Sequence, residues 1–246
     1  MLPRFYAPDL DPGSTTTALP PDEALHLTRV LRLGQGARIA VFDGRGREFL
    51  AVVAAASRDR VQVDLLERVN PVAEARVPLT LVQAVLKGDK MDDVVRDATM
   101  MGVAAIDPIV TAHSIARTRD GSGRGTERWS RVAVSSAKQC RRATVPAIAR
   151  AQPYSEWLAT GGPGLRLILV EPSGSGGSEQ SLHLLEDHAP AALALLVGPE
   201  GGWSEEERED AEKAGCIPVT LGALTLRADA VAVAAIATVR FALRDL

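Results

Sequence analysis

The chain has 246 residues, of which 46% are hydrophobic and 24% charged, and its formal net charge at pH 7 is −3. This composition is typical of a globular protein with one large domain or two modest ones. It argues against a membrane protein, because no stretch approaches about 18 unbroken apolar residues, and the N-terminal MLPRFYAPDL lacks the pattern of a signal peptide.

The first 70 residues predict a small β-rich unit. Residues 21–34 have the apolar spacing of a short helix that stops at Gly34, and DGRG at 43–46 is a hairpin signal. Strands are expected at 37–44, 47–57 and 60–69. Short strands around one helix predict a small barrel, and the linker is expected at 70–78.

The rest of the chain alternates between strands and helices. Such alternation predicts an α/β domain with a mostly parallel sheet and helices on both faces. The helix that includes Thr126 is expected to be capped by it, and the last helix is apolar nearly all round, so it must be buried in the core or against a partner. Strands are expected at 79–87, 103–110, 165–172, 192–202 and 216–222, and helices at 89–102, 125–142, 204–215 and 229–243.

Cysteines and histidines give no sign of a metal centre. Cys140 and Cys216 belong to no CxxC pair, and the four histidines have no HxxxH or HExxH spacing. We therefore expect no disulfide framework, no metal and a cytoplasmic location.

Positive charge is concentrated in one segment. Residues 113–150 hold nine basic and two acidic side chains, a local net charge of +7, whereas residues 151–246 have a net charge of −8. A basic run of this kind is expected of a phosphate-binding surface. A solvated helix that balances the acidic C-terminal third explains the same charge equally well.

The segment LLVGPEGGWSEEERE at 195–209 is the most informative. Ser204 and Glu207 predict a capping box, which explains the acidic helix start and disfavours a phosphate site there. Gly201 and Gly202 beside a proline indicate a rigid loop that offers backbone N–H and C=O groups to a ligand. Two more loops, LVEPSG at 169–174 and LGALTLRADA at 221–230, also follow predicted strands, so the three loops are expected to form one pocket.

Other ligand-binding signatures are missing. No G-x-G-x-x-G follows a predicted strand, which makes a nucleotide-dependent oxidoreductase a poor candidate. No GxxxxGK[ST] or GxSxG occurs either, so P-loop and serine-hydrolase chemistry are excluded.

These motifs resemble the SPOUT (alpha/beta-knot) RNA methyltransferases, in particular the bacterial family that makes 3-methyluridine in 16S ribosomal RNA. Counterparts occur in the same order along nearly the whole chain: PRFY, HLTRVLRLGQGARIAVFDGRG, LKGDKMDDVVRDATMMGVAAIDPI, ERWSRVAVSSAKQCRRATVPAI, LLVGPEGGWSEEE and LGALTLRADA. Each segment alone is a weak motif, but six such segments in the same order across two domains strongly indicate this family.

The resemblance implies an N-terminal PUA-like barrel for RNA over residues 1–72. It also implies a knotted C-terminal domain over residues 73–246 that uses S-adenosylmethionine to methylate uridine N3 in the small ribosomal subunit, and a homodimer. By position, it assigns cofactor binding to Glu171, Pro172, Ser173, Leu196, Val197, Gly198, Pro199, Glu200, Gly201, Gly202, Leu221, Gly222, Leu224, Leu226 and Arg227.

The third loop supplies the catalytic candidates. Arg227 is a permanent cation suited to stabilising a uracil anion, Asp229 is the carboxylate able to accept a proton, and Arg4 of PRFY is a third candidate for RNA phosphate or base. The family typically has L-R-x-E-T-A here, whereas this chain has Asp229 and Ala230; Asp229 as simple N-cap of the last helix is an equal alternative. RNA contacts are predicted for Arg4, Arg29, Arg32, Lys87, Lys90, Arg117, Arg119, Arg124, Arg128, Arg131, Lys138, Arg141 and Arg142.

Two other functions stay open at this point. A related SPOUT enzyme would methylate a ribose 2′-oxygen, which the identity of the methylated nucleoside would reveal. A non-catalytic RNA-binding protein is the second, and failure to bind the cofactor would favour it.

Overall fold

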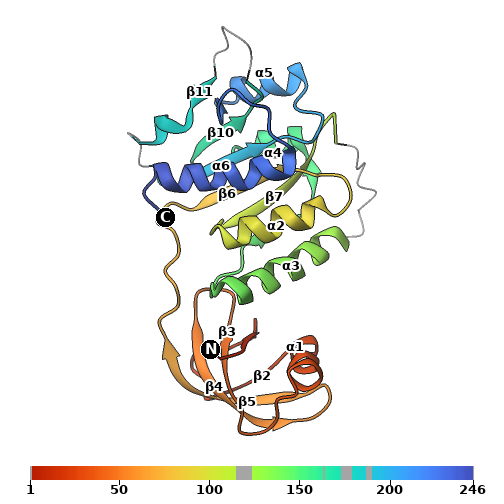
Figure 1. The fold of residues 1–246 in the computed structure, drawn as a ribbon, viewed down its shortest axis with the longest axis vertical. Helices are drawn as coiled ribbons and strands as arrows, with labels where there is room; N and C mark the ends of the chain where they lie inside the picture. Colours follow the sequence, from red (N-terminus) through yellow and green to blue (C-terminus); the bar gives the residue numbers. More distant parts are fainter. Residues whose placement is uncertain (1, 115–123, 163, 173–178, 187–189, 246) are drawn as a thin grey trace. The chain divides into compact units, whose positions relative to one another are not determined.

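The computed structural model describes residues 2–114, 124–162, 164–172, 179–186 and 190–245, without the side chain of Arg124. The chain divides into two compact units (Figure 1). One comprises Met1–Glu74 and Val134–Val145, and the other comprises Ala75–Ala133 and Pro146–Leu246. The long helix α3, Arg124–Cys140, therefore contributes its last residues to the first unit.

The first unit is built on a five-stranded sheet in the order β1-β3-β4-β5-β2. β3 pairs antiparallel with β4, as the hairpin signal predicts, β4 also pairs antiparallel with β5, and β1 runs parallel to β3. Alternate side chains such as Phe5, Val41 and Val63 form the apolar core together with Leu27. The elements are β1 Arg4–Tyr6, β2 Thr16–Ala18, α1 Pro21–Leu25, the π-helical turn η1 His26–Val30, β3 Arg38–Phe42, β4 Glu48–Ala56 and β5 Val61–Val69.

The hairpin at 43–46 is held by one side chain. The Asp43 carboxylate accepts hydrogen bonds from the backbone N–H groups of Arg45 and Arg47 at 2.7 and 3.0 Å. Burial raises the pKa of Asp43, but these bonds and the Arg47 guanidinium outweigh it, so the pKa lies below its ordinary value. Gly44 has φ +74°, which favours glycine.

The second unit is an α/β domain with a parallel sheet, as predicted. The sheet order is β11-β13-β10-β12-β6-β7-β8, with β9 paired to β7, and all these pairs are parallel. The central strands β6 and β12 are wholly buried, as expected when both faces are covered. The strands are β6 Leu79–Ala84, β7 Ala105–Val110, β8 Ala147–Ile148, β9 Gln152–Pro153, β10 Leu165–Leu169, β11 Gln180–Ser181, β12 Leu193–Val197 and β13 Ile217–Thr220.

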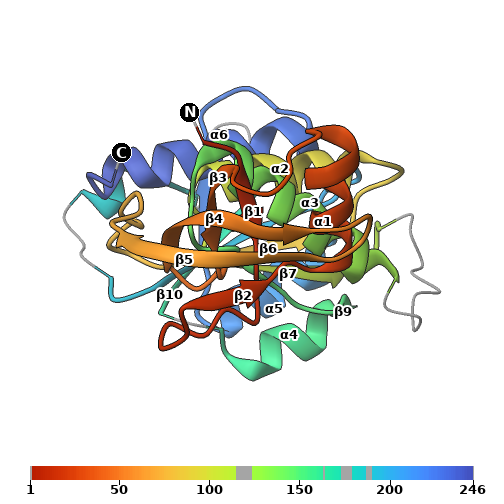
Figure 2. The same cartoon turned by 90° about the horizontal axis from the view of Figure 1, so that it is seen from below.

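Helices cover both faces of this sheet. Tyr154 and Trp157 of α4 and Ala211 of α5 pack on one face, with Val82 and Leu196 among their partners. Figure 2 shows α2 and α6 on the opposite face. The helices are α2 Lys90–Met100, α4 Tyr154–Thr160, the 3-10 turn η2 Leu182–Leu185, α5 Glu205–Lys213 and α6 Ala228–Ala242. No helix among the described residues is both long and apolar enough to span a membrane.

The helix starts confirm one capping prediction and correct two. Ser204 caps α5 and forms the predicted capping box with Glu207. Thr126 is not an N-cap, because α3 already begins at Arg124 and Thr126 lies in its first turn. Asp229 is not the N-cap of α6 either: Arg227 occupies that position, no side chain caps the helix, and Asp229 is in its first turn.

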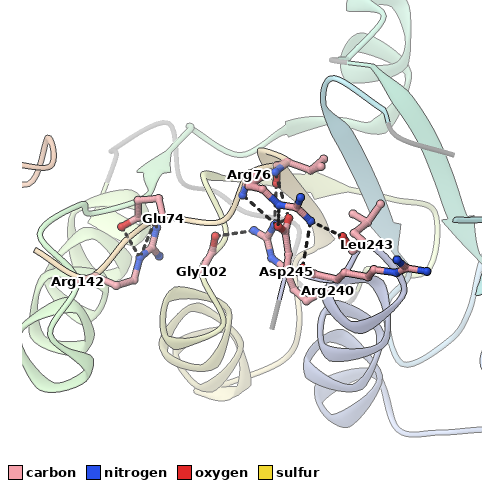
Figure 3. A network of polar contacts seen from close by, with 9 residues as sticks. Glu74, Arg76, Gly102, Arg142, Arg240, Leu243 and Asp245 are labelled. Carbon is pink, nitrogen blue, oxygen red and sulfur yellow. Dashed lines mark hydrogen bonds and ion pairs between the residues drawn. The ribbon is translucent and has the colours of Figure 1, made fainter. Parts of the chain in front are cut away.

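A polar network anchors the chain where it enters the second unit (Figure 3). Asp245, near the C-terminus, accepts hydrogen bonds from the backbone N–H groups of Arg76 and Val77 at 3.3 and 3.1 Å. The buried Arg240 of α6 donates to the carbonyls of Val77 and Gly102, both at 2.7 Å. These bonds fix the start of β6 against the end of α6.

Candidate active site

Loops after three neighbouring parallel strands form a cavity of about 440 Å³ in the second unit. The loops follow β10, β12 and β13, which lie side by side, and the cavity therefore sits at the carboxyl edge of the sheet. Lys90, the first residue of α2, also lines it. The convergence of the three loops that was expected from the sequence is present.

The glycines after β12 are required by close packing within the protein. A Cβ on Gly198 would lie 3.1 Å from Nε1 of Trp203, and one on Gly201 would lie 2.9 Å from Cβ of His113. Gly202 has φ +69°, and its N–H donates to the Pro199 carbonyl at 3.0 Å. Trp203 in turn donates its indole N–H to the Leu169 carbonyl at 2.8 Å, which joins the β12 loop to the end of β10. The loop is therefore a rigid wall whose backbone faces the cavity.

The loop after β13 supplies an exposed apolar wall. The side chains of Leu224 and Leu226 line the cavity, and Leu224 is 79% exposed. Large exposed apolar groups around a cavity indicate a place where an apolar ligand group binds.

Two ion pairs flank the cavity. Nζ of Lys90 lies 2.7 Å from Oε1 of Glu200, and Nε of Arg227 lies 3.2 Å from Oδ1 of Asp229. Burial raises the pKa of Glu200, but hydrogen bonds, chiefly from Lys90, outweigh it and leave the pKa lowered. The hydrogen bond from Arg227 lowers the pKa of Asp229. Both carboxylates are therefore ionised at neutral pH.

Most of the predicted cofactor residues line this cavity. Two described ones do not: Leu196 is fully buried in the sheet, and Gly222, at φ +117°, shapes the β13 loop outside the lining. Ser173 lies outside the described residues. The lining residues from the predicted set are Glu171, Pro172, Val197, Gly198, Pro199, Glu200, Gly201, Gly202, Leu221, Leu224, Leu226 and Arg227.

The structure adds lining residues that the sequence reasoning did not assign to the cofactor, notably Trp203, Arg208, Thr220 and Thr225. Trp203 directly follows the glycine pair, and an aromatic residue at that position could have been assigned to the cavity from the sequence. Lys90 comes from a helix more than 70 residues earlier, and nothing local in the sequence placed it at the cavity.

The donor set fits S-adenosylmethionine. The cavity volume is within the range of small-molecule sites, the leucines suit an adenine ring, and backbone N–H and C=O groups of the loops suit polar edges. The lining carries acidic side chains, Glu171, Glu200 and Asp229, and basic ones, Lys90, Arg208 and Arg227. Such a mixed set complements a ligand that carries sulfonium, ammonium and carboxylate groups.

The three catalytic candidates are divided between the two units. Arg227 and Asp229 are paired at the cavity, and the Arg227 side chain is 75% exposed. Arg4 belongs to the first unit and is buried there, with Nε 2.9 Å from Oε1 of Glu48. This environment favours a structural role for the Arg4 hydrogen-bond donors.

The basic candidates fall into two groups. Arg128, Lys138 and Arg142 pair with acidic side chains: Arg128 with Asp89 and Asp92, Lys138 with Glu23 at 2.8 Å, and Arg142 with Glu74 (Figure 3). Among the described residues, those exposed without an ion-pair partner are Arg29, Arg32, Lys87, Arg131 and Arg141. Arg117, Arg119 and the side chain of Arg124 lie outside the described part of the chain.

Comparisons with known proteins agree with this geometry. A family described as "RNA methyltransferase domain" matches residues 73–240, and one described as "RNA methyltransferase PUA domain" matches residues 19–66. Ribosomal RNA small subunit methyltransferase E of Mycobacterium bovis is 31% identical over 245 residues, which cover 96% of this chain and 90% of that protein.

Solved structures are similar over the whole chain. The Neisseria gonorrhoeae ribosomal RNA small subunit methyltransferase E, solved with S-adenosyl methionine, has 30% identity, a TM-score of 0.86 and 98% coverage of both chains. A probable rRNA-methyltransferase from Porphyromonas gingivalis has 31% identity, a TM-score of 0.83 and 99% coverage of both chains. With a parallel-sheet domain, a PUA domain and a cavity suited to S-adenosylmethionine, the chain belongs to the RNA methyltransferase family.

Proposed function

We propose that this protein transfers the methyl group of S-adenosylmethionine to N3 of a uridine in 16S ribosomal RNA of the small subunit. The observation that carries the proposal is the Arg227–Asp229 pair on the wall of a cavity that fits the methyl donor. The match over nearly the full length of a ribosomal RNA small subunit methyltransferase E supports the substrate. We assign RNA binding chiefly to residues 1–72, with further phosphate contacts from exposed arginines of residues 73–246, and methyl transfer to residues 73–246, in the cytoplasm.

Arg227 is the main catalytic residue in this proposal. Uridine N3 carries a proton, so it becomes nucleophilic when the proton leaves and the charge spreads onto the uracil oxygens. A permanent cation beside the ring stabilises that anion. Because the Arg227 side chain is largely exposed and lines the cavity, it can reach a base presented there.

Asp229 has two roles in this proposal. The hydrogen bond from Arg227 keeps the carboxylate ionised, which makes it available as a proton acceptor but a weak base. The same bond orients the guanidinium. We propose orientation of Arg227 as its first role and proton acceptance as its second.

N3 lies on the Watson–Crick edge of uridine, so the target base must be unpaired and turned out of its stack. We propose that the exposed cations without acidic partners hold the flanking phosphates. This proposal narrows the predicted RNA-binding residues to exposed ones such as Arg29, Arg32, Arg131 and Arg141. Arg128, Lys138 and Arg142 then have a structural role, because they form ion pairs within the protein.

We also propose a homodimer through α6. One stripe of this helix, at the i, i+4, i+7, i+8 and i+11 spacing, is wholly or partly exposed although it is largely apolar. Phe241 ends the stripe and is 75% exposed. The stripe comprises Ala230, Ala234, Ala237, Thr238 and Phe241.

The proposal is tested by nucleoside analysis of ribosomal RNA from a strain that lacks this protein. We expect mass spectrometry to show loss of one 3-methyluridine from 16S RNA, and its return when purified protein and S-adenosylmethionine are added. Loss of a 2′-O-methylated nucleoside instead would assign the related ribose reaction. An unchanged nucleoside profile together with no cofactor binding would leave a non-catalytic RNA-binding protein.

A further inference from the structure

A second cavity, also of about 440 Å³, lies within the first unit. It opens on the sheet face opposite the apolar core, where β1, β3 and β4 present Arg4, Ala40, Glu48 and Leu50. The chain after β5 closes one side, and Arg141, just after α3, stands at its edge. None of its lining residues belongs to the cofactor cavity.

One lining residue, Arg4, is a buried arginine whose hydrogen bonds are complete. The five donors of Arg4 bind both oxygens of Glu48 and the carbonyls of Ala137, Lys138 and Arg142, at 2.9 to 3.1 Å. One face of the guanidinium lies against the Phe42 ring, 4.6 Å from its centroid. Because the Arg4 side chain is only 6% exposed and its donors are all used, its role at the cavity is to hold Glu48 and the end of α3 in place.

The walls suit a flat heterocycle with hydrogen-bond donors on its edge. Leu2, Leu50 and Val72 supply apolar surface, and Val72 is well exposed. Each Glu48 oxygen accepts one bond from Arg4, so each keeps a lone pair for an N–H group of a base.

The edge of the cavity carries a cation in a strained position. Arg141 follows the C-terminus of α3 with φ +70°, where glycine is usually found. Its neighbours Lys138 and Arg142 pair with Glu23 and Glu74, whereas Arg141 is exposed and has no ion-pair partner among the described residues. A free cation beside an apolar slot matches a phosphate attached to a base.

We propose that this cavity binds one unpaired nucleotide of the RNA, with its base against the apolar side chains of Leu2, Leu50 and Val72 and its phosphate on Arg141. The inference rests on the proposed function, because it takes RNA as the substrate. The first unit alone holds this nucleotide, because all the lining residues belong to it.

The experiment compares Arg141→Gly with Arg244→Gly in the full chain. Arg244 is also exposed and also follows a helix with positive φ, at +55°, so the control removes the same charge and relieves the same strain. Methyl-labelled leucine and valine are followed by NMR while each of the four nucleoside 5′-monophosphates, or inorganic phosphate, is added. We expect at least one nucleotide to shift the Leu2, Leu50 and Val72 methyls, with affinity reduced about tenfold by Arg141→Gly and unchanged by Arg244→Gly.

Arg141→Gly should unfold at the same or a higher temperature than the wild type, because glycine adopts positive φ without strain. A lower nucleotide affinity of Arg141→Gly would then not result from a loss of folded protein. The subsite is overturned if no nucleotide moves these methyls at millimolar concentration, if inorganic phosphate alone reproduces the shifts, or if both variants bind alike. Methyl transfer to RNA is measured separately. If nucleotides shift the methyl signals of the wild-type protein but the protein methylates no RNA, the proposed function is wrong and the nucleotide subsite is retained.

Discussion

At the scale of single residues, the chemistry depends on how two carboxylates and two cations share the cofactor cavity. Glu200 is held by Lys90, while Asp229 is held by Arg227. Both carboxylates have lowered pKa values and stay charged well into mildly acidic solution. The site therefore offers fixed charges, and its rate should depend on the ionisation of the uridine more than on that of the protein near neutral pH.

Replacing Arg227 by alanine should cut kcat by about 10²–10³, as for loss of one oxyanion-stabilising donor, with little change in cofactor affinity. Lysine should rescue only in part, because it lacks the planar fork. Raising the pH should partly restore the alanine variant, since the uridine then ionises without help. Single-turnover rates across pH measure this, and full activity of Arg227→Ala would remove the main catalytic assignment.

Asp229→Asn serves as the matched control at the same site. If Asp229 mainly orients Arg227, the amide keeps part of that hydrogen bond and the rate should fall less than in Arg227→Ala. A larger fall that is rescued at high pH would instead identify Asp229 as the proton acceptor.

At the scale of elements, the sequence predicted those structural features that depend only on residues close together in the chain. The capping box of α5 needs only Ser204 and Glu207, three positions apart, and it is present. The start of α6 was misjudged, because a plausible cap residue was weighed without the backbone of the preceding loop, which places Arg227 at the cap position. Gly201 lines the cavity as expected, but its lack of a side chain also makes room for His113 from a distant loop, which the sequence did not indicate.

The apolar stripe of α6 yields a prediction at this scale. Phe241→Glu should weaken dimerisation by at least about 2 kcal/mol, because it places a charge in an interface and removes an aromatic anchor. Sedimentation at micromolar concentration should show wild-type dimers and variant monomers. Leu66→Glu, which changes an exposed leucine of the first unit in the same way, should remain dimeric. A monomeric wild-type protein would contradict the proposed interface.

At the scale of the whole molecule, several of the basic side chains in residues 113–150 are paired with acidic side chains, so the segment exposes less unpaired positive charge than its sequence suggests. Arg128, Lys138 and Arg142 are committed to acidic partners, two of which come from the first 74 residues. No local pattern reveals such pairs, because they form only when distant segments pack. The parallel sheet and the three-loop cavity were predictable, since strand–helix alternation and loop composition report on them directly.

RNA binding should therefore depend on the exposed arginines. Log K should fall with log salt by about 0.7 per neutralised phosphate on single strands. Arg29→Ala combined with Arg131→Ala should weaken binding to all RNAs and reduce that slope by roughly 1.4. Arg96→Ala removes an exposed arginine that is tied to Asp93 and Asp97, and it should change neither quantity. If the wild type, the double variant and Arg96→Ala all have the same salt slope, Arg29 and Arg131 do not contact phosphates and are only solvated.

Arg4 also has a consequence for how the chain is made. Its Glu48 partner is synthesised early, but the carbonyls of Ala137, Lys138 and Arg142 emerge about ninety residues later. At roughly 5–20 residues per second on the ribosome, the nascent barrel waits several seconds with three guanidinium bonds unmade. During that interval water must satisfy the guanidinium, so the first unit is completed only after residues 75–133 of the second unit have been translated. A fragment that stops at residue 74 reproduces this unfinished intermediate and not a mature domain.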